Sequence, residues 1–165
     1  MSKRVAVGLA TLAVLATGSA CTPGQTWPIS PDVGLGRDSS GQLVLLGNLC
    51  SVTLAKIELG QGKNPFDKAQ STLVPTGQVT NHFRVDLAHP GPTFQLASGA
   101  DPSSLGAPIW VRVSAPDGFW ATAVFETTPQ PGAVLAVPYG SKSGSPESTP
   151  LDDYPVGSPD CGRTG

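Results

Sequence analysis

From residue 32 onward, short apolar runs alternate with polar segments that contain turn-forming residues. Several short strands at such close spacing are typical of an antiparallel β-sandwich. The pattern predicts an all-β, Ig-like sandwich of seven or eight strands, with no helix longer than a turn or two. The strands are expected at residues 32–37, 42–49, 53–59, 79–87, 93–96, 109–114, 119–127 and 133–138.

The predicted strands differ in how many of their faces are apolar. The strand at 42–49 is apolar on both faces, so we expect it in the interior of a sheet. The strand at 53–59 alternates, with Lys56 and Glu58 on its polar face, which is typical of a half-buried strand. Residues 60–77 are polar and contain several Gly and Pro residues, and they are predicted to form a long loop.

The best-defined hairpin is predicted around residues 115–118, which read Ala-Pro-Asp-Gly. Pro suits the second position of a type I turn, and Gly tolerates the positive φ that follows it. We expect a three-residue loop with a bulge. The resulting register has three pairs, which are Val113 with Ala121, Val111 with Ala123, and Ile109 with Phe125.

This register places Trp110, Arg112 and Trp120 together on the opposite face of the hairpin. Exposed aromatic rings on a flat sheet suit sugar rings or a protein partner, and an Arg side chain can stack on Trp. The alternative is that this face is buried, or that the two Trp side chains pack under the loop at 60–77. Exposure of the two Trp side chains would favour a binding site for cell-wall glycan or a small ligand.

Composition excludes several classes of protein. The 165 residues include 20 Gly and 17 Pro, and only 13% of the residues are charged. Many Gly and Pro residues disfavour an all-helical fold, and a low charge disfavours a coiled coil. Without Lys3 and Arg4, the chain has eight basic and 12 acidic residues, a net charge of −4. Nucleic acid is therefore not an expected partner, because its binding needs a basic surface.

The first twenty residues have the organisation of a secretory signal peptide. A basic start, residues 1–4, precedes an apolar run at 5–16 and a stretch of small residues at 17–20. The apolar run is shorter than the roughly 20 residues that cross a bilayer. We therefore interpret residues 1–20 as an export signal.

Cys21 follows this signal directly, after Gly18-Ser19-Ala20. The segment resembles the lipobox of bacterial lipoproteins, although this family usually has an aliphatic residue at the position of Gly18. The resemblance implies that Cys21 becomes the first mature residue and carries a diacylglyceryl group, which anchors the protein to the membrane. The composition, rich in Gly, Pro and Ala, is similar to that of actinobacterial lipoproteins. The alternative is ordinary cleavage after Ala20 and a secreted, soluble protein.

Lipidation of Cys21 would leave Cys50 and Cys161 as a pair. Outside the cytoplasm such a pair is expected to form a disulfide, although two free thiols are the alternative. The expected domains are a signal peptide at 1–20, a tether at 21–31, the sandwich at 32–139 and a tail at 140–165. The tail is rich in Ser, Gly and Pro, so it is expected to lean towards disorder unless the disulfide fixes it.

His82, Arg84 and Asp86 form the one cluster of titratable residues in the pattern. Alternation along a strand would place all three on one face, where a solvated polar surface is the usual interpretation. The sequence has no nucleophile motif and no Cys and His spacing typical of a metal site, so we expect neither an enzyme nor a cofactor or metal. A deep cleft at His82 would instead favour a hydrolase.

These observations favour a non-enzymatic, exported lipoprotein that presents a β-sandwich as a binding or adaptor module at the cell envelope. The expected partners are the membrane, through the lipid on Cys21, and an envelope protein or the cell-wall glycan. The face with Trp110, Arg112 and Trp120 is the candidate binding surface. Fold alone does not identify the partner.

Overall fold

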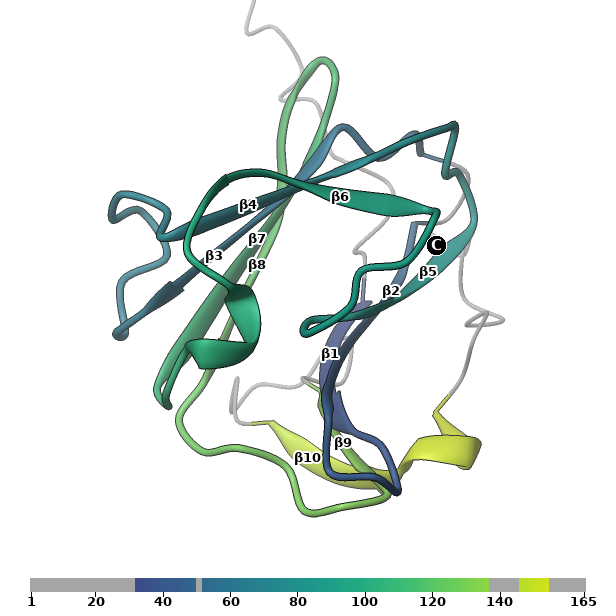
Figure 1. Ribbon diagram of the computed structural model, residues 1–165, viewed down its shortest axis with the longest axis vertical. Helices are drawn as coiled ribbons and strands as arrows, with labels where there is room; N and C mark the ends of the chain where they lie inside the picture. The colour runs from purple at the N-terminus through teal and green to yellow at the C-terminus, as the bar shows by residue number, and fades with distance from the viewer. Residues whose placement is uncertain (1–31, 50–51, 137–145, 155–165) are drawn as a thin grey trace, which may run out of the picture.

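The computed structural model describes residues 32–49, 52–136 and 146–154. Over these residues the chain forms ten strands and two short 3-10 helices. The strands make two five-stranded antiparallel sheets that pack together as a β-sandwich (Figure 1). The predicted all-β sandwich is therefore confirmed, although it has more strands than the seven or eight expected.

Sheet A joins early and late segments of the chain. Its strands follow the order β10-β9-β1-β2-β5, so the late strand β9 pairs with β1. The 3-10 helix η2 (Leu151–Asp153) follows the last strand. The strands of sheet A are β1 (Asp32–Arg37), β2 (Leu43–Asn48), β5 (His82–Asp86), β9 (Ala133–Ala136) and β10 (Glu147–Pro150).

Sheet B contains the five remaining strands, in the order β6-β4-β3-β7-β8. The 3-10 helix η1 (Pro102–Ser104) lies in the connection from β6 to β7. The strands of sheet B are β3 (Lys56–Gln61), β4 (Ser71–Pro75), β6 (Phe94–Gly99), β7 (Ile109–Ala115) and β8 (Gly118–Phe125).

The main hydrophobic core lies between the two sheets and takes its side chains from both. Alternation along each strand sends every second side chain into this core, where loss of contact with water stabilises the fold by about 25 cal/mol per Å². Phe83 of β5 and Phe94 of β6 meet edge to face, with 6.0 Å between ring centroids. Large side chains that are fully buried in the core include Leu35, Leu45, Ile57, Leu59, Leu73, Ile109 and Phe125.

The predicted hairpin is confirmed in the three expected pairs of β7 and β8. The irregularity lies between Val113 and Ser114, so that Trp120 is the residue of β8 without a partner. Ala115 pairs directly with Gly118, which leaves a two-residue connection instead of the expected three. The extra residue of the bulge is thus in the strand and not in the turn.

One prediction about an irregular segment is wrong, and another remains a prediction only for residues that the structure does not describe. The segment at 60–77, expected to be a loop, contains β4, whose Leu73 is fully buried in the core. The tail at 140–165 is expected to lean towards disorder unless a disulfide fixes it, and its described part, residues 146–154, contains β10 and η2. Both segments are held by pairing with a strand that already exists, since β4 pairs with β3 and β10 pairs with β9.

A second apolar cluster covers the outer face of sheet A. Val44 and Leu46 alternate with the core residues of β2 and therefore point outward, where they meet Val134 and Tyr154. This cluster confirms that β2 is apolar on both faces, and β2 lies inside the sheet between β1 and β5. Gly34 leaves the space for Tyr154, because a Cβ there would lie only 3.0 Å from the Cζ of Tyr154.

Candidate functional site

The predicted binding face lies on the outer side of sheet B, but Trp110 is not exposed on it. Trp110 is 0% exposed and Arg112 is partly buried. The interpretation of Trp110 as an exposed platform for sugar rings is therefore wrong. Trp120 lies on β8, and its side chain is outside the described part of the chain.

Trp110 is buried by its neighbours on the outer face. Its partner on β3 is Gly60, and a Cβ at Gly60 would lie 2.7 Å from the indole Nε1. The connection from β3 to β4 folds back over the same face, because Pro65 accepts a hydrogen bond from Arg112 at 2.9 Å. The alternative stated from the sequence, a Trp under the loop at 60–77, fits Trp110.

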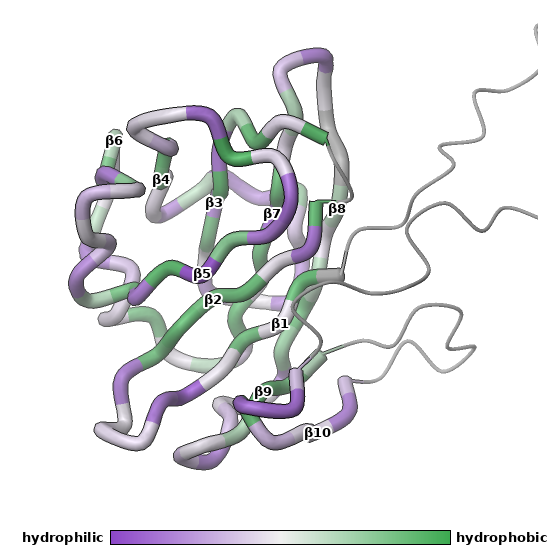
Figure 2. Tube along the Cα trace, turned by 90° about the vertical axis from the view of Figure 1, so that its right-hand side faces the viewer, coloured by the Kyte–Doolittle hydropathy of each residue, from purple (hydrophilic) through white to green (hydrophobic). Residues whose placement is uncertain are grey.

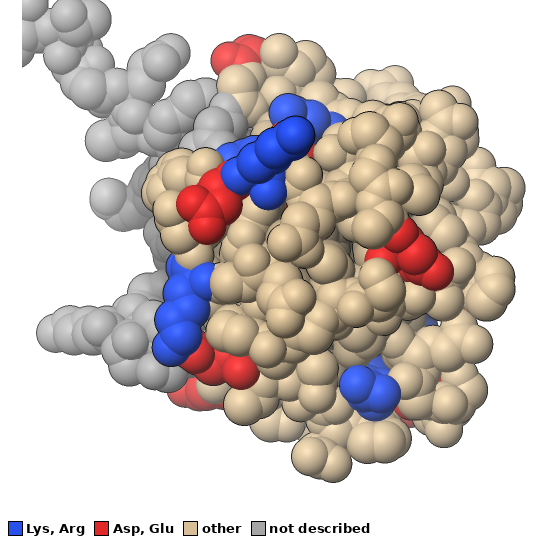
Figure 3. All heavy atoms as spheres, turned by 60° about the vertical axis from the view of Figure 1, so that its left-hand side comes forward, with Lys and Arg blue, Asp and Glu red and all other residues tan. Residues whose placement is uncertain are grey.

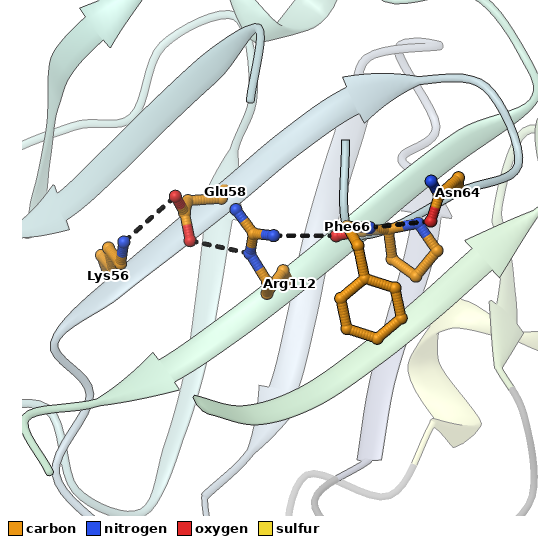
Figure 4. A network of polar contacts seen from close by, with 6 residues as sticks. Lys56, Glu58, Asn64, Phe66 and Arg112 are labelled. Carbon is orange, nitrogen blue, oxygen red and sulfur yellow. Dashed lines mark hydrogen bonds and ion pairs between the residues drawn. The ribbon is translucent and has the colours of Figure 1, made fainter. Parts of the chain in front are cut away.

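Arg112 connects the loop to the sheet through a network of ion pairs (Figure 4). Its Nε donates to Glu58 at 2.9 Å, and Lys56 contacts the other carboxylate oxygen at 3.0 Å. The guanidinium carbon lies 5.4 Å from the centroid of the Trp110 ring, within the range of a cation–π contact. Arg112 thus touches β3, the loop and the indole at once.

Glu58 is ionised in this network although it is largely buried. Burial raises its pKa, but hydrogen bonds and charge from Arg112 and Lys56 outweigh burial, so the pKa of Glu58 lies below its usual value. Its side chain is 11% exposed, so solvent screens the pair with Arg112 less than it would at the surface. Glu58 therefore fixes Arg112 in place.

The loop has its own internal support. Asn64 accepts a hydrogen bond from the backbone N–H of Phe66 at 3.1 Å and donates to Asp67 at 2.7 Å. An exposed ion pair joins Lys63 to Glu126, just beyond β8, at 2.8 Å. The hydrogen bonds shape the loop, and the ion pair attaches it to the segment after β8.

A hollow of about 410 Å³ lies beside the network. Among the described residues, hydrogen bonds use the Nε and Nη1 of Arg112, so its Nη2 can donate a further hydrogen bond to a ligand. Two cations and one carboxylate give the hollow a net charge of +1, which suits a carboxylate or a mixed polar surface of a partner better than a polyanion. The hollow is lined by Lys56, Glu58, Arg112, Ser114, Ala115, Pro116 and Gly118.

His82, Arg84 and Asp86 lie on one face of β5, as predicted, but they do not form one site. His82 and Arg84 are exposed and line a hollow of about 390 Å³ that Asp86 does not reach. Asp86 instead accepts hydrogen bonds from the backbone N–H groups of Ala88 and His89. Its carboxylate therefore stabilises the turn after the strand.

The remaining predicted sites lie outside the described residues, namely Cys21, Cys50 and Cys161. Within the described ranges, no three metal-ligating side chains come together. The same part of the chain has no helix with the length and apolarity needed to cross a membrane. No protein-family model, no curated protein and no solved structure matches the chain.

Sequence reasoning did not identify the partners of Arg112. The alternation at 53–59 places Lys56 and Glu58 on a polar face, but only the order of the strands brings this face beside Arg112. The sequence signal that could have helped is Gly60, a residue without a side chain that directly follows the alternating pattern. It leaves room for a large ring from the neighbouring strand.

Proposed function

We propose that this protein is a non-enzymatic lipoprotein that displays a β-sandwich as a binding or adaptor module at the cell envelope. The observation that carries the proposal is the position of Cys21, directly after a signal-like segment and shortly before the first strand, β1. Such an order supports a folded module held close to a lipid anchor.

The length of the connection limits how far the module reaches. Ten residues lie between Cys21 and Asp32, where β1 begins, so the connection has eleven Cα–Cα steps. A fully extended chain rises at most about 3.3–3.6 Å per residue, so the connection spans no more than roughly 40 Å. The sandwich would therefore meet partners near the membrane surface.

The surface of the sandwich supports binding of an uncharged or mixed polar partner. Charged side chains are sparse on the face shown in Figure 3, and basic and acidic groups lie mostly beside each other. The network of Lys56, Glu58 and Arg112 on sheet B has the same character. Since Trp110 is buried, its ring does not support the alternative of a glycan stacked on it.

The anchor is tested by the variant Cys21→Ser in the full chain. We expect the wild-type protein in the membrane fraction and the variant in the soluble fraction, because only a thiol accepts the diacylglyceryl group. Mass spectrometry of the mature N-terminal peptide should show the added lipid mass in the wild type alone. Cys161→Ser serves as the control and should remain in the membrane fraction. A Cys21→Ser variant that stays membrane-bound would overturn the proposal.

A further inference from the structure

The four edge strands of the sandwich differ in their protection against pairing with another strand. Edge strands expose backbone N–H and C=O groups, and natural proteins protect them with charges, proline, short length, bulges or covering segments. β5 carries His82, Arg84 and Asp86, and the four-residue β10 carries Glu147 and Pro150. β8 runs beside β1 of the other sheet. These three edges therefore carry charge or proline, or lie beside another strand.

β6 has only one of these devices, a bulge at Ala97. The strand reads Phe-Gln-Leu-Ala-Ser-Gly, without charge and without proline, and all residues after Phe94 are exposed. It pairs with β4 on one side, and it lies at the outer margin of the molecule in Figure 2. Ala97 is skipped in the pairing with β4, and this bulge is the one irregularity in the ladder. The strand thus presents an open edge of uncharged backbone.

An exposed apolar side chain lies in the middle of this edge. Leu96 is 44% exposed, and in the described part of the chain only Phe66 is a more exposed large hydrophobic residue. Its neighbours Gln95 and Ser98 are polar but uncharged. Backbone pairing at this edge would therefore remove apolar surface from water as well as satisfy hydrogen bonds.

We propose that two copies of the chain associate through antiparallel pairing of their β6 strands. A two-fold axis near Leu96 would place the Leu96 side chains of both copies together and join the two copies of sheet B into one ten-stranded sheet. A second copy of the chain fits this edge because β6 is uncharged, so pairing two β6 strands brings no like charges together. The same pairing through β5 would oppose charged side chains.

The area buried by this contact is small, so we expect a weak dimer. One six-residue strand buries less than the roughly 1,200 Å² of a standard interface, so we expect a dissociation constant on the order of 10–100 μM. Anchoring two copies in one membrane would raise their effective concentration and favour the dimer. This last step rests on the proposed lipid anchor, whereas the pairing itself does not.

Sedimentation equilibrium of the Cys21→Ser chain tests the pairing without any contribution from a lipid. Concentrations from about 1 to about 500 μM bracket the expected dissociation constant. We expect a monomer–dimer equilibrium that Leu96→Lys weakens at least about tenfold, because two ammonium groups would meet at the axis. His82→Lys, a change at an exposed position on the edge of sheet A, should leave the dimer intact.

Ala97→Lys provides a second charge on the same exposed edge and should also weaken the dimer. Circular dichroism should show unchanged folding of all three variants, since each changed side chain is exposed. The pairing would be overturned if the Cys21→Ser chain stayed monomeric at every concentration. It would also be overturned if Leu96→Lys and Ala97→Lys both left the dimer unchanged. If the Cys21→Ser chain dimerises but the wild-type protein carries no lipid on Cys21, the anchor alone is overturned. If the wild-type protein carries the lipid but the Cys21→Ser chain stays monomeric, the pairing alone is overturned.

Discussion

Each outer face of the sandwich is covered by a segment of the chain, and under each cover an aromatic ring lies beside a glycine. The two covers are held in place by different interactions. On sheet A the ring of Tyr154 comes from the covering segment, residues 151–154, and Gly34 lies in the sheet beneath the ring. On sheet B the ring of Trp110 belongs to the sheet, beside Gly60, and a loop lies above it. The cover of sheet A is apolar, whereas ion pairs and hydrogen bonds hold the cover of sheet B.

This contrast predicts which of the two covers can open without unfolding the rest of the sandwich. The cover of sheet A comes from the far end of the described chain and contacts the sheet through a small cluster and the β9–β10 ladder. The cover of sheet B connects two adjacent strands, and Arg112 ties it to β7, which lies between β3 and β8. Loss of the first should stay local, whereas loss of the second should weaken the whole sandwich.

Trp110→Ala should have the largest effect on stability. It removes a large, fully buried ring and the surface on which Arg112 lies, so we expect a loss of about 3–5 kcal/mol in the free energy of unfolding. Urea denaturation followed by circular dichroism measures this loss. Lys68→Ala, an exposed position of the same loop, should stay within about 0.5 kcal/mol of the wild type. An equally small effect of Trp110→Ala would refute the role of the ring.

Tyr154→Ala should have a smaller and more local effect. We expect a loss of about 2–3 kcal/mol, because Tyr154 is buried in a small cluster on the outer face. Hydrogen exchange should become faster in β9 and β10 and remain slow in β3 and β7. Asp153→Ala, an exposed neighbour, serves as the control. Equal loss of protection in both sheets would contradict a cover that opens alone.

Local signals in the sequence predicted the fold where contacts are local. The register of the β7–β8 hairpin follows from a four-residue turn and the alternation beside it, and the structure confirms it. β4 was missed because Ser71–Pro75 contains few apolar residues and lies among glycines and prolines. Its strand conformation depends on pairing with β3 and β6, which no local pattern shows. The Ig-like connectivity remains a prediction.

The site was predicted less well because it depends on the order of the strands. The sequence placed Arg112 and Trp110 on one face, and it did not identify Glu58 as the carboxylate beside them. Likewise, Gly34 and Tyr154 lie far apart in the chain, so neither residue signals that the other will cover it. Alternation along a strand identifies a polar face, but it does not show whether water or another segment of the chain covers that face.

Gly60→Ala tests how tightly the cover of sheet B fits. The added methyl group would overlap the Trp110 ring, which the loop and Arg112 hold in place, so we expect a loss of about 1–2 kcal/mol. Gly77→Ala is the matched control, because its methyl group would meet open space and its φ is not positive. Thermal unfolding of both variants measures the difference. Equal stability of the two variants would show that the ring moves freely under the loop.

Glu58→Gln should cost the least, about 1 kcal/mol at neutral pH, because Gln keeps one acceptor for Arg112 but loses the charge. Glu126→Gln is the matched control at an exposed ion pair and should change stability by only a few tenths of a kcal/mol. Chemical denaturation at pH 7 measures both variants. A loss from Glu126→Gln as large as that from Glu58→Gln would contradict the role given to burial.

The effect of pH gives the same variant a sharper test. Because the pKa of Glu58 in the folded chain lies below its usual value of 4.5, ionised Glu58 stabilises the fold above that pH. This contribution is lost as the pH falls through the lowered pKa, where the carboxylate takes up a proton. The stability difference between wild type and Glu58→Gln should therefore be constant near neutral pH and shrink below pH 4.5. A difference that grows in acid would mean that Glu58 is destabilising when charged, and that Arg112 holds the loop without it.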